Sequence, residues 1–111
     1  MLKTKKGIKF DGEKPRMELI PDDMLEEVAK VLTFGSKKYD GDDNWMKVPN
    51  AVKRYTGALR RHYKDYWKAQ YRGREDLRYD KETGCSHLAH AICCALFLMW
   101  FEQNPNKEVK E

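Results

Sequence analysis

The stretch from Cys85 to Leu98, CSHLAHAICCALFL, decides the fold because it begins the most apolar segment of a highly polar chain. Ser86 is a suitable N-cap, and the pattern that follows predicts a helix over 86–103. The apolar run is shorter than the roughly 20 residues that span a bilayer, which argues against a membrane-spanning helix. A helix that is apolar on nearly every side must be buried. We therefore expect it at the centre of the fold, covered by other helices and by a second subunit.

Two further helices are expected on the N-terminal side of this segment. Pro21, followed by two aspartates in the first turn, starts a helix over 21–39, where apolar residues recur at helical spacing. Asn50 is a suitable N-cap for a helix over 51–71. Around that helix, apolar and aromatic side chains fall on one face, and a stripe of lysines and arginines falls on the opposite face.

The remaining segments are expected to carry little regular structure. Residues 1–20 predict an extended arm or weak strand, residues 72–85 a charged loop, and residues 104–111 a polar tail that frays. A chain of 111 residues fits one domain, 1–111. We therefore predict an all-α fold, a small bundle of three main helices with an extended N-terminal arm. Because so short a chain buries a modest fraction of its surface, we expect a homodimer or higher homo-oligomer to complete it.

Composition limits the partners and the compartment. The formal net charge of +4 and a pI near 8.9 indicate mild attraction to anions, too little for a dedicated nucleic-acid-binding protein. The number of cysteines is odd, and Cys93 and Cys94 are adjacent in an apolar run, which favours reduced thiols. The basic N-terminus has no apolar stretch behind it, which argues against a signal peptide. These features predict a cytoplasmic protein with no membrane partner.

The histidines of the opening stretch are candidates for a functional site. His87 and His90 are three residues apart, so they share one face of the predicted helix. The helix N-terminus disfavours a protonated imidazole and favours the neutral form, which binds metals. His62 also falls on the apolar face of its helix, but it lies about two and a half turns before the loop. We expect it to approach the other two only loosely and favour a structural role for it.

Carboxylates are the other candidate ligands. Glu26 and Glu27 lie on the first predicted helix, and Glu75 and Asp80 lie in the charged loop. Glu27 is at the edge of the apolar face, where a carboxylate can line a site, whereas Glu26 points further outward. Mg²⁺ prefers carboxylate oxygens, whereas Mn²⁺ accepts a mixed carboxylate and imidazole shell. For any one of these acids alone, a solvated charge is the simpler interpretation.

A zinc site is an alternative use of the soft ligands in the opening stretch, which are Cys85, His87, His90 and Cys94. Their spacing matches no closed structural zinc pattern, and one helix does not bring all four around a single ion. A phosphohydrolase of the HD type is excluded, because no His-Asp dipeptide occurs in the chain.

Several stretches together resemble a known family: GIKFDGEKPRMELIP (7–21), LEEVAKVLTFGSKKY (25–39), NW (44–45), ALRRH (58–62) and DKETGCSHLAHA (80–91). Their order and spacing are similar to those of the phage-associated dATP/dGTP diphosphohydrolase N-terminal family. Members of this family are grouped with the all-α, MazG-like nucleotide pyrophosphohydrolases. The resemblance covers residues 7 to about 101, and its FGSKKY and ETG-x-x-HLAHA segments are the specific parts.

The resemblance implies an oligomeric helical bundle that cleaves a purine (d)NTP between the α and β phosphates and requires Mn²⁺ or Mg²⁺. Under this interpretation the catalytic residues are Glu27, Glu75, His87 and His90. The metal ligands come from Glu26, Glu27, Asp80, His87 and His90. Lysine and arginine are the usual phosphate partners, and aromatic rings can stack on a base. The expected nucleotide-binding residues are therefore Lys14, Arg16, Lys37, Lys38, Tyr39, Trp45 and Arg61.

The chain departs from the general MazG-like pattern, which has E-E-x-x-E on the first helix and E-x-x-D on a later one. Here Lys30 takes the place of the third glutamate, and His87 and His90 take the place of the later acids. This change favours Mn²⁺ over Mg²⁺, or fewer metals, or binding without turnover. One alternative is therefore a phage protein that sequesters a nucleotide or nucleotide signal without cleaving it. A weaker alternative, suggested by the basic stripe, is a helical nucleic-acid-binding protein.

Overall fold

The computed structural model describes residues 5–111, and within that range it contains helices and no β-strand. The long helices are α1 (Asp22–Lys38), α3 (Ala51–Tyr71) and α4 (His87–Gln103), and a short helix α2 (Asn44–Lys47) lies between the first two. Single 3-10 turns occur at Met17–Leu19, Glu75–Leu77 and Pro105–Lys107. The all-α prediction is confirmed, and each end of the long helices lies within one residue of its expected position.

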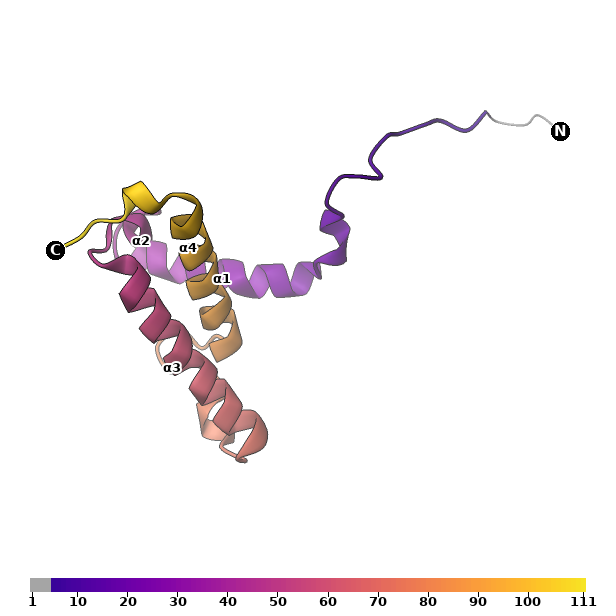
Figure 1. The fold of residues 1–111 in the computed structure, drawn as a ribbon. Coiled ribbons are helices and arrows are strands. Elements are labelled where there is room, and N and C mark those ends of the chain that lie inside the picture. The colour runs from indigo at the N-terminus through magenta and orange to yellow at the C-terminus, as the bar shows by residue number, and fades with distance from the viewer. Residues whose placement is uncertain (1–4) are drawn as a thin grey trace.

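Helix α4 is the element on which α1 and α3 both pack (Figure 1). It runs antiparallel to α3, and α1 crosses it. Most of its buried side chains are small, since Ala89, Ala91, Cys93 and Cys94 are at most 8% exposed. Small side chains let helix backbones approach closely, and Phe101, at 2% exposure, fills the space near the C-terminal end. In the described residues, no helix is both long enough and apolar enough to cross a membrane.

The start of α4 is capped as the sequence predicts. The Ser86 side chain accepts a hydrogen bond from the backbone N–H of Leu88 at 3.1 Å. This bond satisfies one of the N–H groups that the first turn of a helix leaves without a partner. The cap fixes the position at which α4 begins and therefore where His87 and His90 lie.

Helix α3 begins at the predicted residue, but its first turn is capped differently from the prediction. Asn50 occupies the N-cap position, but its backbone is left-handed (φ 56°) and its side chain caps no N–H of the first turn. The Glu108 carboxylate instead accepts from the N–H of Val52 at 3.0 Å, and Asn50 N–H donates to the Val109 carbonyl at 2.7 Å. The predicted N-cap position of Asn50 is therefore confirmed, although its side chain does not cap the first turn, and the tail that was expected to fray is hydrogen-bonded to the start of this helix. The free N–H groups and the dipole at a helix start attract a carboxylate from elsewhere in the chain.

An aromatic cluster fastens α2 to the bundle. The Trp45 ring stacks on Phe97, with centroids 4.5 Å apart and planes 14° apart. Trp45 also meets Trp100 and Phe101 edge-on, at 5.2 and 6.1 Å. The Tyr55 hydroxyl donates to the Trp45 carbonyl at 3.1 Å. These contacts hold the segment between α1 and α3 against α4, and this segment forms one wall of the cavity described below.

The N-terminal segment contributes little to this core. Residues 5–16 form no helix or strand, and Ile8 and Phe10 are 82% and 90% exposed. Figure 1 shows this segment leading away from the helices. The radius of gyration is 19.0 Å, whereas a compact domain of this length has one of about 13 Å. Docking of the segment onto the rest of the protein stays a prediction.

Candidate functional site

A cavity of about 820 Å³ opens between the C-terminal half of α1, the segment that contains α2, and the facing sides of α3 and α4. This volume lies within the range of small-molecule sites in proteins, about 300–1,000 Å³. Both signs of charge line it, and so do imidazoles. The ionisable lining side chains are Lys37, Lys38, Tyr39, Asp42, Arg54, Tyr55, Arg61, His62, Asp80, Glu82, His90, Cys93 and Cys94.

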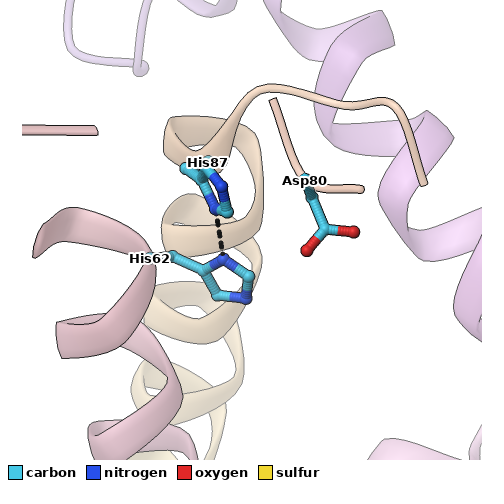
Figure 2. A group of neighbouring side chains, drawn as sticks. All are labelled: His62, Asp80 and His87. Atoms are coloured by element: carbon cyan, nitrogen blue, oxygen red, sulfur yellow. Dashed lines mark hydrogen bonds between the residues drawn. The ribbon is translucent and has the colours of Figure 1, made fainter. Parts of the chain in front are cut away.

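The three histidines of the chain come together, one from α3 and two from α4, and His62 and His90 line the cavity, whereas the buried His87 is not part of its lining. His62 Nδ1 lies 2.8 Å from His87 Nδ1, which is hydrogen-bonding distance (Figure 2). The His62 ring also stacks on His90, with centroids 4.5 Å apart and planes 15° apart. The expectation that His62 would approach the others only loosely is therefore wrong.

The reason lies in the connection between α3 and α4. The last turns of α3 continue past the start of α4, so the connection doubles back along α3 (Figure 1). Hydrogen bonds hold it there: Arg74 N–H donates to the Lys68 carbonyl at 3.2 Å, and Arg78 donates to the Gln70 side chain at 3.3 Å. As a result α4 begins beside the middle of α3, where His62 lies. Counting turns from the end of α3 overestimated the separation.

Asp80 brings a carboxylate to the cluster from the same connection. Its Oδ1 accepts from the backbone N–H groups of Glu82 and Thr83, at 3.0 and 2.9 Å, and from the Thr83 hydroxyl at 3.2 Å. Thr83 Oγ1 is also 2.7 Å from His90 Nε2. Burial acts to raise the pKa of Asp80, but the Thr83 hydrogen bond and the nearby His90 imidazole outweigh it, so the pKa is lowered. Asp80 is therefore a fixed, ionised carboxylate at neutral pH.

The cluster keeps two of its imidazoles neutral. Burial lowers the pKa of His62 to about 4, and the neighbouring His90 and His87 rings add to the effect. Burial also lowers the pKa of His90. Neutral imidazoles have a free nitrogen lone pair, so they can accept a proton or bind a metal ion. His87 is 6% exposed, and its Nε2 lies 3.8 Å from Asp65 Oδ2, too long for a hydrogen bond but close enough to attract the N–H.

The same cavity carries the cations expected to bind phosphate. Lys37, Lys38 and Arg61 line it together with Tyr39 and Trp45, and these five are sequence-predicted nucleotide-binding residues. Lys38 forms an ion pair with Glu82 at 2.7 Å, and this hydrogen bond raises the pKa of Lys38. One face of the Trp45 ring is used in packing on Phe97. The role of these residues toward a nucleotide stays a prediction.

Other predicted site residues lie outside the lining. Glu27 pairs with Lys30 at 2.8 Å, and Glu75 pairs with Arg78 at 2.5 Å. Glu26 is exposed on α1, Lys14 is exposed in the N-terminal segment, and Arg16 pairs with Glu18 there. The structure thus unites Asp80, His87 and His90 of the expected metal ligands, and it places Glu26 and Glu27 apart from them.

Sequence reasoning missed three contributors to the cluster: His62 as a member, Asp65 beside His87, and Thr83 between Asp80 and His90. A signal existed for Thr83, because Asp80 and Thr83 have the spacing at which an aspartate accepts from backbone N–H groups in a turn. Asp65 follows His62 by three residues, so the two share a face of α3.

Three donor groups could hold a metal ion together. One ligand atom each from His62, Asp80 and His87 lies within 4.8 Å of the others. Figure 2 shows the two imidazoles facing one another, with the carboxylate of Asp80 directed toward the same space. Cys85, Cys93 and Cys94 are buried free thiols outside this group.

Comparison with known proteins places the chain in a family. The sequence model described as "dATP/dGTP diphosphohydrolase, N-terminal" matches residues 4–111. A protein of Salmonella phage PMBT28 named "dATP/dGTP diphosphohydrolase" is 37% identical over 98 residues, which cover 88% of this chain and 30% of the phage protein. The chain therefore spans less than a third of the length of that relative, and no solved structure matches it. Since the match extends over nearly its whole length, the chain belongs to the dATP/dGTP diphosphohydrolase N-terminal family.

Proposed function

We propose that this protein is a metal-dependent nucleotide pyrophosphohydrolase of MazG-like type, which cleaves purine (d)NTPs to the monophosphate and pyrophosphate. The name of the phage relative supports a diphosphohydrolase that acts on dATP or dGTP. The observation that carries the proposal is the composition of the cavity, whose lining combines lysines and an arginine with imidazoles and a carboxylate. A triphosphate needs cations along its chain, and hydrolysis needs a group that positions and deprotonates water.

The side chains divide into two groups in this proposal. Lys37, Lys38 and Arg61 neutralise the phosphate oxygens, and Tyr39 and Trp45 are the aromatic residues available to contact the base. Lys38 must exchange its ion pair with Glu82 for phosphate, at a small cost because the pair is 40% and 56% exposed.

The second group surrounds the reacting phosphorus. His90 is neutral at pH 7 and lines the cavity, so its imidazole can accept the proton of an attacking water. Thr83 holds His90 in place through the 2.7 Å hydrogen bond. Asp80, His87 and His62 fit a divalent cation such as Mn²⁺ in the chemistry of their donor atoms. When bound, such an ion neutralises developing charge on phosphate oxygens and acidifies water.

Incubation of the purified protein with each dNTP and Mn²⁺ or Mg²⁺ tests the proposal directly. We expect pyrophosphate and the monophosphate in equal amounts from dATP or dGTP, resolved by ion-exchange chromatography. Lys37→Ala should raise KM, whereas Lys53→Ala, an equal loss of charge on an exposed part of α3 outside the cavity, should leave KM unchanged. Absence of product from every purine nucleotide under both metals refutes the proposal.

A homodimer or higher homo-oligomer is part of the proposal. Ile92, Leu96 and Met99 are 46%, 40% and 49% exposed, and their spacing places them on one face of α4. This helix is otherwise the centre of the fold. In the described residues, Phe101 is the only large side chain that is fully buried, so one copy offers a small core. A second copy packed on this face would complete it.

Binding without cleavage is a second candidate function. Lys30, in the position of a MazG-like acid, pairs with Glu27 and so occupies the carboxylate that the MazG-like pattern uses for metal. Calorimetry with a panel of purine nucleotides, followed by recovery of the ligand, separates the two candidates. Tight binding with intact ligand favours sequestration.

The weaker nucleic-acid alternative rests on an open groove on α3, lined by Leu59, Arg60, Arg61, Tyr63, Lys64 and Trp67.

A further inference from the structure

We propose that His62, His87 and Asp80 together bind one first-row transition-metal ion, such as Zn²⁺, Co²⁺ or Mn²⁺, and prefer it over Mg²⁺. The inference deepens the proposed function, on which its catalytic meaning rests. The binding itself is a property of the chain alone and is tested without nucleotide. His62 is the new member of the site, since the sequence alone favoured a structural role for it.

The spacing of the imidazole nitrogens suits a shared ion. The two Nδ1 atoms are 2.8 Å apart. Two nitrogens bound to one ion at about 2.05 Å lie about 2.9 Å apart at a right angle, and about 3.3 Å apart in a tetrahedral arrangement. To admit the ion, the rings therefore need to separate by at most about half an ångström and to turn so that both lone pairs point at the ion rather than at each other. The three donor atoms lie within 4.8 Å of one another, so the Asp80 carboxylate must also move closer to the nitrogens.

Metal binding requires the proton shared by the His62 and His87 rings to move to another ring nitrogen, and the structure provides for this. Without metal, one of the two facing Nδ1 atoms must carry the proton of their hydrogen bond. When both Nδ1 atoms bind an ion, each ring carries its proton on Nε2. His87 Nε2 points toward the Asp65 carboxylate, 3.8 Å away. A carboxylate behind a ligating histidine fixes the tautomer and orients the ring, and this pairing is common in metal sites.

The Asp80 carboxylate is also held in a fixed orientation by its neighbours. Asp80 Oδ1 is held by Glu82 and Thr83, and in the described part of the chain no hydrogen bond reaches Oδ2. One oxygen thus fixes the side chain and the other is left for a ligand. Two imidazole nitrogens with one carboxylate oxygen are typical of transition-metal sites, whereas Mg²⁺ prefers an all-oxygen shell. The His87 side chain is only 8% exposed, so its ring nitrogens are shielded from water.

Calorimetric titration of the full chain, first stripped by a chelator, tests the site with each metal chloride alone and no nucleotide. We expect one ion per chain, with Zn²⁺ and Co²⁺ bound more tightly than Mn²⁺ and Mg²⁺ weakest. The visible absorption of bound Co²⁺ gives an independent readout of imidazole ligation. His62→Asn and Asp80→Asn should each weaken binding by about 100-fold or more, above the 10–100-fold typical of residues behind the ligands.

Asp76→Asn is the matched control for Asp80→Asn. Asp76 lies in the same connection, is exposed, and pairs with Arg74 at 2.9 Å, outside the group of donor atoms. It should retain wild-type metal affinity. Helical circular dichroism and the melting temperature show whether each variant folds. Because His62 and Asp80 are only half-buried, their variants can test the site even if a variant of the buried His87 does not fold.

Three results overturn the inference: no binding of any transition metal, Mg²⁺ bound as tightly as Co²⁺, or binding that His62→Asn and Asp80→Asn leave unchanged. Failure here remains distinguishable from failure of the proposed function. Hydrolysis in Mg²⁺ without transition-metal binding overturns this inference alone. Tight metal binding without hydrolysis of any purine nucleotide supports it and overturns the function.

Discussion

Replacing Trp45 with alanine should destabilise the protein strongly, because this ring fastens α2 to the bundle. It stacks on Phe97 and meets Trp100 and Phe101 edge-on. Core Trp→Ala changes typically cost about 3–5 kcal/mol, and Trp45 is only half-buried, so we expect about 3 kcal/mol. For a domain of this size, that loss lowers Tm by about 10–20 °C.

The measurement is urea unfolding followed by helical circular dichroism, with thermal melting as a second readout. Trp67→Ala is the matched control, since Trp67 contacts only its near neighbours Tyr71 and Arg72 among the described aromatic and cation pairs. Trp67 is also half-buried, but without the contacts to Phe97, Trp100 and Phe101 its loss should cost less, about 1–2 kcal/mol. Equal destabilisation by the two changes, or a loss below about 1 kcal/mol for Trp45→Ala, would refute the packing argument.

Trp45→Phe then separates packing from nucleotide contact. A phenylalanine retains much of the stacking on Phe97, so stability should fall far less than in the alanine variant. If Trp45 also stacks on a base, the same variant should weaken purine nucleotide binding while the fold remains stable. Unchanged nucleotide affinity in a stable Trp45→Phe protein would leave Trp45 with a structural role alone.

Three further predictions follow from the site and its surroundings. Asp65→Asn should weaken Co²⁺ affinity about 10–100-fold in calorimetry, because the carboxylate behind His87 orients that ring. Leu96→Glu should shift the protein toward a monomer in light scattering, because Leu96 lies in the exposed apolar face of α4. Burial raises the pKa of Cys93 to about 12 and of Cys94 to about 11, so these thiols stay protonated through pH 8 to 10. Ellman's reagent should react with them slowly at pH 8 and about tenfold faster per added pH unit, and fast reaction at pH 8 would contradict their burial.

The helices were predictable because their signals are local. Periodic apolar residues, aspartates in a first turn and a serine N-cap each act within a few residues of where they occur. The Ser86 cap is confirmed by its hydrogen bond to Leu88 N–H. The start of α3 was less predictable, because the capping carboxylate comes from Glu108, 56 residues away from Val52 in sequence. A cap supplied by tertiary structure leaves no mark in the local sequence.

The site was predictable only in part for the same reason: local signals can be read from the sequence, whereas tertiary contacts cannot. His87 and His90 were identifiable because one helix fixes their relative position, and Asp80 because it precedes that helix in a charged loop. The place of His62 depends on how far α4 is shifted along α3. The connection sets this shift through the hydrogen bonds of Arg74 to Lys68 and Arg78 to Gln70.

That shift has a consequence for the chemistry. With α4 beginning beside the middle of α3, a third imidazole joins His87 and His90, and the cluster is rich in nitrogen. The substitution of acids by His87 and His90 then no longer reads as the loss of a Mg²⁺ site. In the proposed metal site, His87 joins His62 and Asp80 in a different donor set, which suits transition metals. The histidine pair is therefore consistent with catalysis in this cavity, provided that the ion it holds is of that class.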